Sequence, residues 1–148
     1  LMLKNFTTNN ISNATPIHRA VWNDEIEIEM ESVYAQKNSI VSDIVQGSYR
    51  EKVMSITIDT VVTQRKISKV DMLSLTLNGA EIEALIGAAE VLTNLRPRVV
   101  LAGWYRRDGK RVCDKAKEIL EKFDYYVHIG KRGSVLALPR ELVLTSST

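Results

Sequence analysis

The chain has 148 residues, of which 45% are hydrophobic and 26% are charged, and its formal net charge is +2 at pH 7. These values are typical of one soluble globular domain, here residues 1–148, and they exclude a disordered or fibrous chain. The small net charge also excludes a strongly basic protein that needs a polyanionic partner.

The sequence indicates no membrane-spanning segment, no disulfide and no metal site. No apolar run approaches the roughly 20 residues that span a bilayer, and the N-terminus has no signal-peptide core, so we expect a cytoplasmic protein. A single cysteine excludes an internal disulfide and a cysteine-based zinc cluster. His18 has no second ligand at metal-binding spacing, and we therefore predict no metal site.

The first part of the chain predicts two strands. Residues 14–21 are typical of a strand, although Pro16 indicates that its beginning is an edge or a lead-in. At 25–30 the sequence EIEIEM alternates acids with apolar residues, the pattern of a half-exposed antiparallel strand, and 33–35 is a candidate partner. The acidic stripe is either a solvated strand face or a surface for a metal or a basic partner, and we favour the solvated face.

A loop, a strand and a helix follow. The polar residues 38–51 show little periodicity and predict a loop. Residues 52–58 predict a further strand, and either Thr57 or Asp59 is the cap of a short helix that runs through Gln64.

The centre of the chain predicts a strand that turns directly into a helix. Residues 70–77 are apolar at positions on both faces, as in a strand that helices cover on each side. Asn78 is the predicted N-cap, and Glu81 is spaced to reach back to the N–H of Asn78 in a capping box. Pro97 forbids continuation of the helix. The apolar face of this helix comprises Ile82, Leu85, Ile86, Ala89 and Leu92.

The C-terminal part predicts a strand, a loop, a helix and a hairpin. A short buried strand at 98–102 leads to a loop at 103–109, in which Asp108 is the predicted cap of the next helix. The segments 125–129 and 134–138 flank two glycines and indicate an antiparallel hairpin. The apolar face of the helix comprises Val112, Ala116, Ile119, Leu120 and Phe123.

This order of elements predicts an α/β sheet that is parallel at its centre and closes with a C-terminal antiparallel hairpin. In such sheets, ligands bind beyond the carboxyl ends of the parallel strands, which here lead into 20–24, 77–81 and 103–109. Two of these segments contain a tryptophan. Trp22 and Trp104 are either pocket walls or side chains packed at a strand end.

Four segments resemble motifs of one known family. SLTLNGAEIEALIGA resembles the signature of the FkbM-type S-adenosylmethionine-dependent methyltransferases, and KNFTTNNISNATPIHRAVW, ITIDTVV and PRVVLAGWY are similar to further motifs in the family's order. The likeness covers nearly the whole chain. It implies a Rossmann-like methyltransferase sheet, S-adenosylmethionine as cofactor, and a small-molecule methyl acceptor that the sequence does not identify.

The resemblance begins part-way through the family pattern. In that fold the cofactor lies over a glycine-rich turn after the first strand, and an acid after the second strand binds the ribose hydroxyls. The sequence contains neither feature, so we expect a truncated sheet. The resemblance identifies no catalytic residue. It makes six residues candidates for cofactor or substrate binding: Ala20, Trp22, Thr76, Asn78, Glu81 and Trp104.

The substitutions within the signature bear on activity. The family has charged residues where this chain has Ser74, Thr76 and Asn78, and neutral groups cannot supply that charge to a sulfonium cofactor or its acceptor. We therefore predict a diverged methyltransferase domain that is inactive as an isolated chain. One alternative is a non-catalytic association domain with the same fold. A nearly neutral chain favours solvated loop cations over a weaker alternative, an RNA-binding surface. That aromatic and basic surface comprises Trp104, Tyr105, Arg106, Arg107, Lys110 and Arg111, with Lys131 and Arg132 in the later hairpin.

A truncated sheet would leave one edge of the strand at 70–77 bare. This edge is apolar, lacks proline, and has only Asp71 as a charge that discourages pairing. Either the strand at 17–21 shifts into the gap, or a second copy pairs along the edge and makes a symmetric homodimer. We favour the homodimer.

Overall fold

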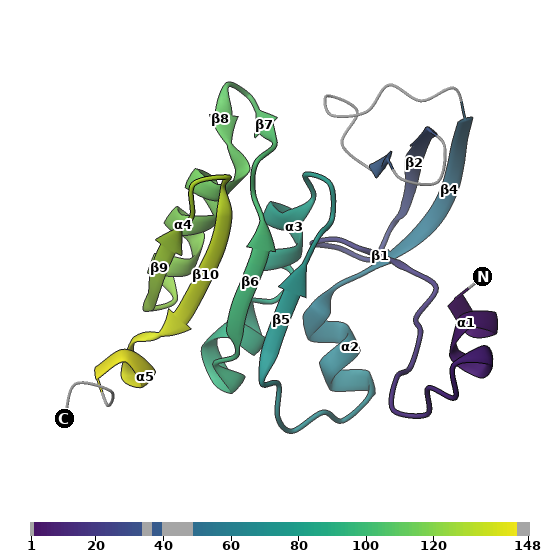
Figure 1. Ribbon diagram of the computed structural model, residues 1–148, viewed down its shortest axis with the longest axis horizontal. Coiled ribbons are helices and arrows are strands. Elements are labelled where there is room, and N and C mark those ends of the chain that lie inside the picture. The colour runs from purple at the N-terminus through teal and green to yellow at the C-terminus, as the bar shows by residue number, and fades with distance from the viewer. Residues whose placement is uncertain (1, 34–36, 40–48, 145–148) are drawn as a thin grey trace.

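The computed structural model describes residues 2–33, 37–39 and 49–144, which form two separate four-stranded sheets, a two-stranded hairpin and the helices between them (Figure 1). Parallel and antiparallel pairing are mixed, and the fold is α/β, as predicted. The sheet built from the second half of the chain carries the hydrophobic core.

This C-terminal sheet is parallel on one side and antiparallel on the other. In spatial order its strands are β5 (Met72–Leu75), β6 (Arg98–Ala102), β10 (Ser134–Pro139) and β9 (Tyr125–Ile129). β5 and β6 run parallel, and the other neighbours are antiparallel. The strand predicted at 98–102 and the C-terminal hairpin are confirmed, whereas the strand predicted at 70–77 is shorter than expected.

Two helices cover one face of the C-terminal sheet. α3 (Glu81–Ile86) and α4 (Val112–Lys122) lie behind its strands in Figure 1. The predicted apolar face of α4 is confirmed, because Val112, Ala116 and Leu120 recur at helical spacing and are fully buried. The core beneath the helices comprises Leu75, Ala84, Leu85, Ala88, Leu92, Val99, Leu101, Cys113, Ala116, Leu120, Tyr125, Val135 and Ala137.

The helix predicted after β5 is interrupted. α3 ends at Ile86, which is 49% exposed and so does not belong to the buried face. A π-helical turn, η2 (Val91–Leu95), follows. The interruption falls at Gly87, where a Cβ would lie 3.2 Å from the Cα of Asn23. The Cβ would also clash with the backbone oxygen of Trp22, so only glycine fits where the segment after β1 passes this closely.

The N-terminal sheet contains β1 (Ala20–Val21), β4 (Tyr49–Ile56), β2 (Glu27–Val33) and β3 (Lys37–Ser39) in that order. The alternating EIEIEM segment contributes to β2 and pairs antiparallel with β4, as its pattern predicts. Lys52 Nζ lies 2.7 Å from Glu27 Oε1, and Arg50 Nη1 lies 3.4 Å from Glu29 Oε2. The acidic stripe is therefore an exposed strand face with cross-strand ion pairs.

The first predicted strand is much shorter in the structure. Of residues 14–21, only Ala20 and Val21 pair, parallel to Ser55 and Ile56 of β4. The chain before them includes a short helix, α1 (Met2–Thr8), none of whose residues is buried.

Two further predictions for this half are corrected. The acidic strand pairs with β4, and the end of β2 also pairs with β3, so 33–35 is not the partner. β2 itself runs to Val33, and 34–36 lie outside the described residues. The predicted loop at 38–51 contains part of β3 and the start of β4. Its residues 40–48 also lie outside the described part of the chain.

α2 (Ile58–Gln64) lies where it was predicted. Thr57 is its N-cap and accepts the N–H of Thr60 at 2.9 Å. Asp59, the alternative cap, instead accepts the N–H groups of Glu90 and Val91 at 3.0 and 2.9 Å. Its carboxylate therefore joins α2 to the start of η2.

The segment after β6 is a small hairpin. β7 (Arg106–Arg107) and β8 (Lys110–Arg111) pair antiparallel. Their turn residues, Asp108 and Gly109, have φ angles of 49° and 76°, as in the two-residue turn that Asp-Gly favours. The prediction that Asp108 caps α4 is therefore wrong, and Arg111 occupies the cap position without a side-chain cap bond.

Candidate functional site

The candidate site lies at the carboxyl ends of β5 and β6. These strands are parallel neighbours, so the segments that follow them meet at one edge of the sheet, at the top in Figure 1. This edge is where open α/β sheets bind ligands. Thr76, Asn78 and Glu81 follow β5, and Trp104 follows β6.

Glu81 is completely buried at this edge. Its carboxylate accepts the N–H of Leu77 at 2.7 Å and that of Gly79 at 2.9 Å. Burial raises the pKa of the Glu81 carboxyl, and these backbone hydrogen bonds oppose the rise. The side chain does reach back, as predicted, but its partners flank Asn78. It therefore fixes the turn between β5 and α3.

Asn78 is not the N-cap of the helix, which corrects the predicted capping box. Ala80 holds the cap position and makes no side-chain cap bond. Asn78 has a left-handed φ of 52°, a conformation that asparagine tolerates better than most residues. Its Oδ1 accepts the hydroxyl of Tyr105 at 2.8 Å. Asn78 thus links the segments that follow β5 and β6.

Tyr105 and Arg107 are site residues that the sequence analysis named only as part of the aromatic and basic surface around Trp104. Arg107 donates to both carboxylate oxygens of Glu83 at 2.8 and 2.9 Å, and to the carbonyl of Gly79 at 2.9 Å. The side chains of Arg107 and Glu83 are only 19% and 13% exposed. The available signal was their position in the segment after β6, which was predicted to meet the segment after β5.

Trp104 and Thr76 are exposed at the same edge. Trp104 is 51% exposed, and its ring centroid lies 5.5 Å from that of Tyr105 with the planes 38° apart. The backbone of Trp104 rests on Gly133, where a Cβ would lie 3.1 Å from its Cα. Trp104 therefore offers an aromatic surface beside the polar link between Asn78 and Tyr105.

Ala20 and Trp22 lie elsewhere. Trp22 follows β1 and donates its backbone N–H to Ile56 at 3.1 Å. Its backbone packs against Gly87, at the C-terminal end of α3, whereas Glu81 begins that helix. The structure therefore brings together four of the six candidates, Thr76, Asn78, Glu81 and Trp104, and separates Ala20 and Trp22 from them.

A close contact places the start of α4 against the end of β6. A Cβ on Gly103 would lie 2.7 Å from the backbone nitrogen of Cys113, and the N–H of Cys113 donates to the Gly103 carbonyl at 3.0 Å. Cys113 is buried, and burial raises the pKa of its thiol. A buried neutral thiol is a small apolar side chain, in agreement with the predicted core face.

Three basic residues near Trp104, in addition to Arg107, have acidic or carbonyl partners. Arg111 pairs with Asp114 at 2.9 Å, and Lys115 pairs with Asp108 at 3.2 Å. Arg106 donates to the carbonyl of Gly109 at 2.9 Å. These contacts favour solvated, locally paired loop cations over an RNA-binding surface.

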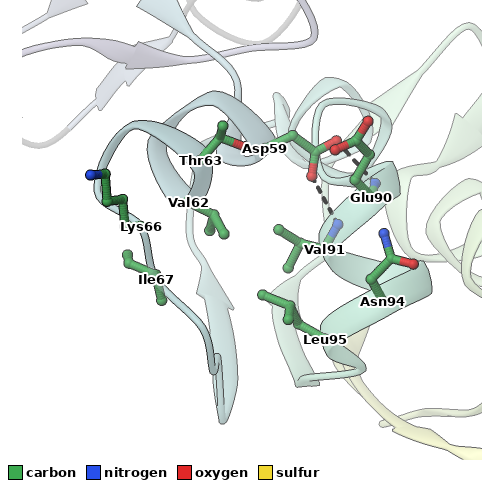
Figure 2. Close-up of a pocket in the computed structure, with 9 residues that line it drawn as sticks. All are labelled: Asp59, Val62, Thr63, Lys66, Ile67, Glu90, Val91, Asn94 and Leu95. Atoms are coloured by element: carbon green, nitrogen blue, oxygen red, sulfur yellow. Dashed lines mark hydrogen bonds between the residues drawn. The ribbon is translucent and has the colours of Figure 1, made fainter.

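A separate pocket lies between α2 and η2 (Figure 2). Its volume is about 230 Å³, and its residues are Asp59, Val62, Thr63, Lys66, Ile67, Glu90, Val91, Asn94 and Leu95. It contains residues that precede β5 and β6, so it lies away from their carboxyl ends. The carboxylate of Asp59 is engaged by two backbone N–H groups. Its size is below the roughly 300 Å³ at which ligand pockets begin, and we assign it a structural role.

The part of the chain that the structure describes contains neither a metal cluster nor a membrane-spanning helix. There, no group of three or more His, Cys, Asp or Glu side chains is placed to hold a metal ion. In the same residues, no helix is long and apolar enough to cross a membrane.

Comparison with known proteins identifies the family. No curated protein and no solved structure matches the chain. The family model for the methyltransferase FkbM domain matches residues 3–129, which include β5, β6 and the segments at their carboxyl ends. The chain therefore belongs to the FkbM methyltransferase family.

Proposed function

We propose that this chain serves S-adenosylmethionine-dependent methyl transfer, with the carboxyl ends of β5 and β6 as its part of the site. The observation that carries the proposal is the hydrogen bond between Tyr105 and Asn78 beside the exposed Trp104. It joins two neighbouring parallel strands at the edge where α/β sheets bind ligands. The strand order β5-β6-β10-β9, with its antiparallel end, supports a Rossmann-like methyltransferase sheet.

The described residues at this edge do not fit S-adenosylmethionine by themselves. The cofactor carries a sulfonium cation, an amino-acid end and ribose hydroxyls, and such groups need carboxylates and backbone donors. Glu81 is enclosed and engaged by two backbone N–H groups, and Glu83 is engaged by Arg107. Thr76 and Trp104 offer only neutral contacts. We therefore derive no chemical step through the cofactor from these residues.

The proposal accordingly has a second part. The remaining contacts to the cofactor come from residues that these 148 do not include, and the isolated chain transfers no methyl group. A rigid turn, held by Glu81 and tied to β7 through Arg107, would present Asn78 and Trp104 in a fixed position to that assembly. The methyl acceptor stays unassigned.

Nuclear magnetic resonance titration of the isotope-labelled chain with S-adenosylhomocysteine tests both parts. We expect small shifts at the amides of 76–81 and 103–105 that do not saturate at millimolar ligand. Trp104→Ala should abolish these shifts. Tyr126→Ala, which removes an aromatic residue of similar exposure from β9, should keep them. Shifts confined to other segments would contradict the location, and saturation at micromolar ligand would contradict the incomplete site.

One observation favours the second candidate function, a non-catalytic association domain. β5 lies at the end of its sheet with a single neighbour, β6, among the described strands. Methylation of an acceptor by the isolated chain would exclude this candidate, and it would contradict the second part of the proposal as well.

A further inference from the structure

The peptide bond between Asn78 and Gly79 lies in the turn that follows β5, at the candidate site. Both residues have positive φ angles, 52° and 103°, and the N–H of Ala80 donates to the carbonyl of Leu77 at 3.3 Å. Asn-Gly favours a tight turn of this kind. Asparagine is also a thermolabile residue, most of all before glycine, because glycine has no side chain that shields its backbone nitrogen. The turn therefore places a reactive side-chain amide at this edge of the sheet.

The reaction of an Asn-Gly pair is deamidation. Hydroxide or another base removes the proton of the glycine N–H, and the nitrogen attacks Cγ of the asparagine. A new C–N bond forms, the side-chain nitrogen leaves as ammonia, and a cyclic succinimide remains. Water then opens the ring at either carbonyl and gives aspartate or isoaspartate. Base and water are the only co-reactants, and a neutral amide is replaced by a carboxylate.

The attacking nitrogen is engaged in the folded chain. The N–H of Gly79 donates to Oε2 of Glu81 at 2.9 Å, and Glu81 is completely buried. The N–H must leave this acceptor before its nitrogen can attack. A buried carboxylate beside the nitrogen also disfavours the negative charge that develops there. Glu81 therefore slows the first step of deamidation.

The attacked side chain is held by a second contact. Oδ1 of Asn78 accepts the hydroxyl of Tyr105 at 2.8 Å, which fixes the amide against the segment after β6. Asn78 is half-buried, so base and water have access to it once the contact opens. Because Cγ must turn towards the nitrogen of Gly79, cyclisation breaks this hydrogen bond.

We propose that Asn78 is a deamidation site whose rate is set by local opening of this turn. Opening breaks the bonds to Tyr105 and Glu81 without unfolding the sheet. An aspartate at position 78 can still accept the Tyr105 hydroxyl, now in a charge-assisted hydrogen bond. It adds a negative charge at an edge where the carboxylates of Glu81 and Glu83 are already engaged. The inference does not depend on the proposed function.

Peptide mapping by mass spectrometry measures the conversion in the full chain, incubated folded in mildly alkaline buffer. Fragmentation of the peptide that contains Asn78 separates aspartate from isoaspartate. We expect slow conversion at Asn78 in the unmodified chain. Tyr105→Phe should raise the rate about fivefold, the factor that corresponds to one net hydrogen bond. Tyr126→Phe, which alters an exposed tyrosine on β9, should leave the rate unchanged.

Two further controls separate opening of the turn from unfolding of the whole chain. Leu120→Val creates a cavity beside the buried face of α4 and lowers global stability, but it should leave the rate at Asn78 unchanged. In concentrated urea, the unmodified chain and Tyr105→Phe should convert equally, and faster than the folded chain. No conversion in the folded chain, an unchanged or slower rate for Tyr105→Phe, or equal acceleration by Leu120→Val would each overturn the proposal.

Discussion

The hydroxyl of Tyr105 donates to Oδ1 of Asn78 at 2.8 Å, and this contact holds together the ends of two parallel strands. Asn78 has a left-handed backbone conformation, and Tyr105 directly follows the exposed Trp104. The pair therefore sets the geometry of the candidate site without providing a charge to it.

The first prediction concerns this pair. Asn78→Ala and Tyr105→Phe should each destabilise the fold, and the double variant should show a coupling energy of about 1 kcal/mol, the usual net contribution of one hydrogen bond. Urea unfolding of the four proteins measures it. Combining Asn78→Ala with Tyr126→Phe, which alters an exposed tyrosine on β9, should give additive effects. If the changes in unfolding free energy caused by Asn78→Ala and Tyr105→Phe are also additive, the hydrogen bond contributes nothing to stability.

The second prediction concerns the buried carboxylate. Glu81→Ala should lower the free energy of unfolding by roughly 2–4 kcal/mol, because the N–H groups of Leu77 and Gly79 lose their acceptor in or near the core. The control Glu118→Ala alters an exposed acid of α4 and should stay within about 0.5 kcal/mol of the unmodified chain. Equal stability of both variants would refute the structural role of Glu81.

The third prediction compares two glycines. Gly103→Ala should destabilise by roughly 1–3 kcal/mol, because the new methyl group would meet the backbone of Cys113 at 2.7 Å. Gly109→Ala meets no atom within 4 Å, and its cost should be limited to about 1 kcal/mol for a φ of +76°. Thermal unfolding followed by circular dichroism ranks the two. A less stable Gly109→Ala variant would contradict the close packing of α4 on β6.

The fourth prediction concerns pH. Glu141, in α5 (Arg140–Leu144), accepts hydrogen bonds from Arg96 at 2.9 and 2.8 Å, and these lower the pKa of the Glu141 carboxyl from its ordinary value of 4.5 to about 2. The unfolded chain therefore binds the proton more readily. The contribution of this pair is present above the unfolded pKa and is lost as the pH falls through about 2.

The corresponding measurement is urea unfolding at pH 7 and at about pH 2. Because the Glu141 side chain is 53% exposed, solvent screening limits the contribution to about 1 kcal/mol or less. Glu141→Gln should be less stable than the unmodified chain at pH 7, and the difference should shrink towards pH 2. The control Glu118→Gln should show no such trend. A difference that persists unchanged in acid would rule out the ion pair as its cause.

Local patterns predicted much of the fold. The C-terminal hairpin, the strand at 98–102 and the buried face of α4 follow from periodicity and turn chemistry within a few residues. The same rules predicted the cap of α2 only as either Thr57 or Asp59. The break at Gly87 does not follow from them, because it depends on the backbone of residues 22 and 23, which are distant in sequence. The separation of the chain into two sheets is likewise a tertiary property.

The candidate site was predicted less completely. The segments that meet were identified from the rule for parallel strands, but the roles of their residues depend on contacts across the sheet. Asn78 satisfies the sequence criteria for a cap, yet it adopts a left-handed turn and bonds to Tyr105. The rule for parallel strands brings the segment of Arg107 near the segment after β5, but it does not indicate that Arg107 bonds to Glu83 and Gly79.

Calorimetric titration of the isolated chain with S-adenosylmethionine tests the central claim most directly. The claim is that the ends of β5 and β6 form one part of a methyltransferase site that does not hold the cofactor alone, since Glu81 and Glu83 are already engaged. The account predicts no binding heat at micromolar concentrations. A dissociation constant in the micromolar range would contradict it.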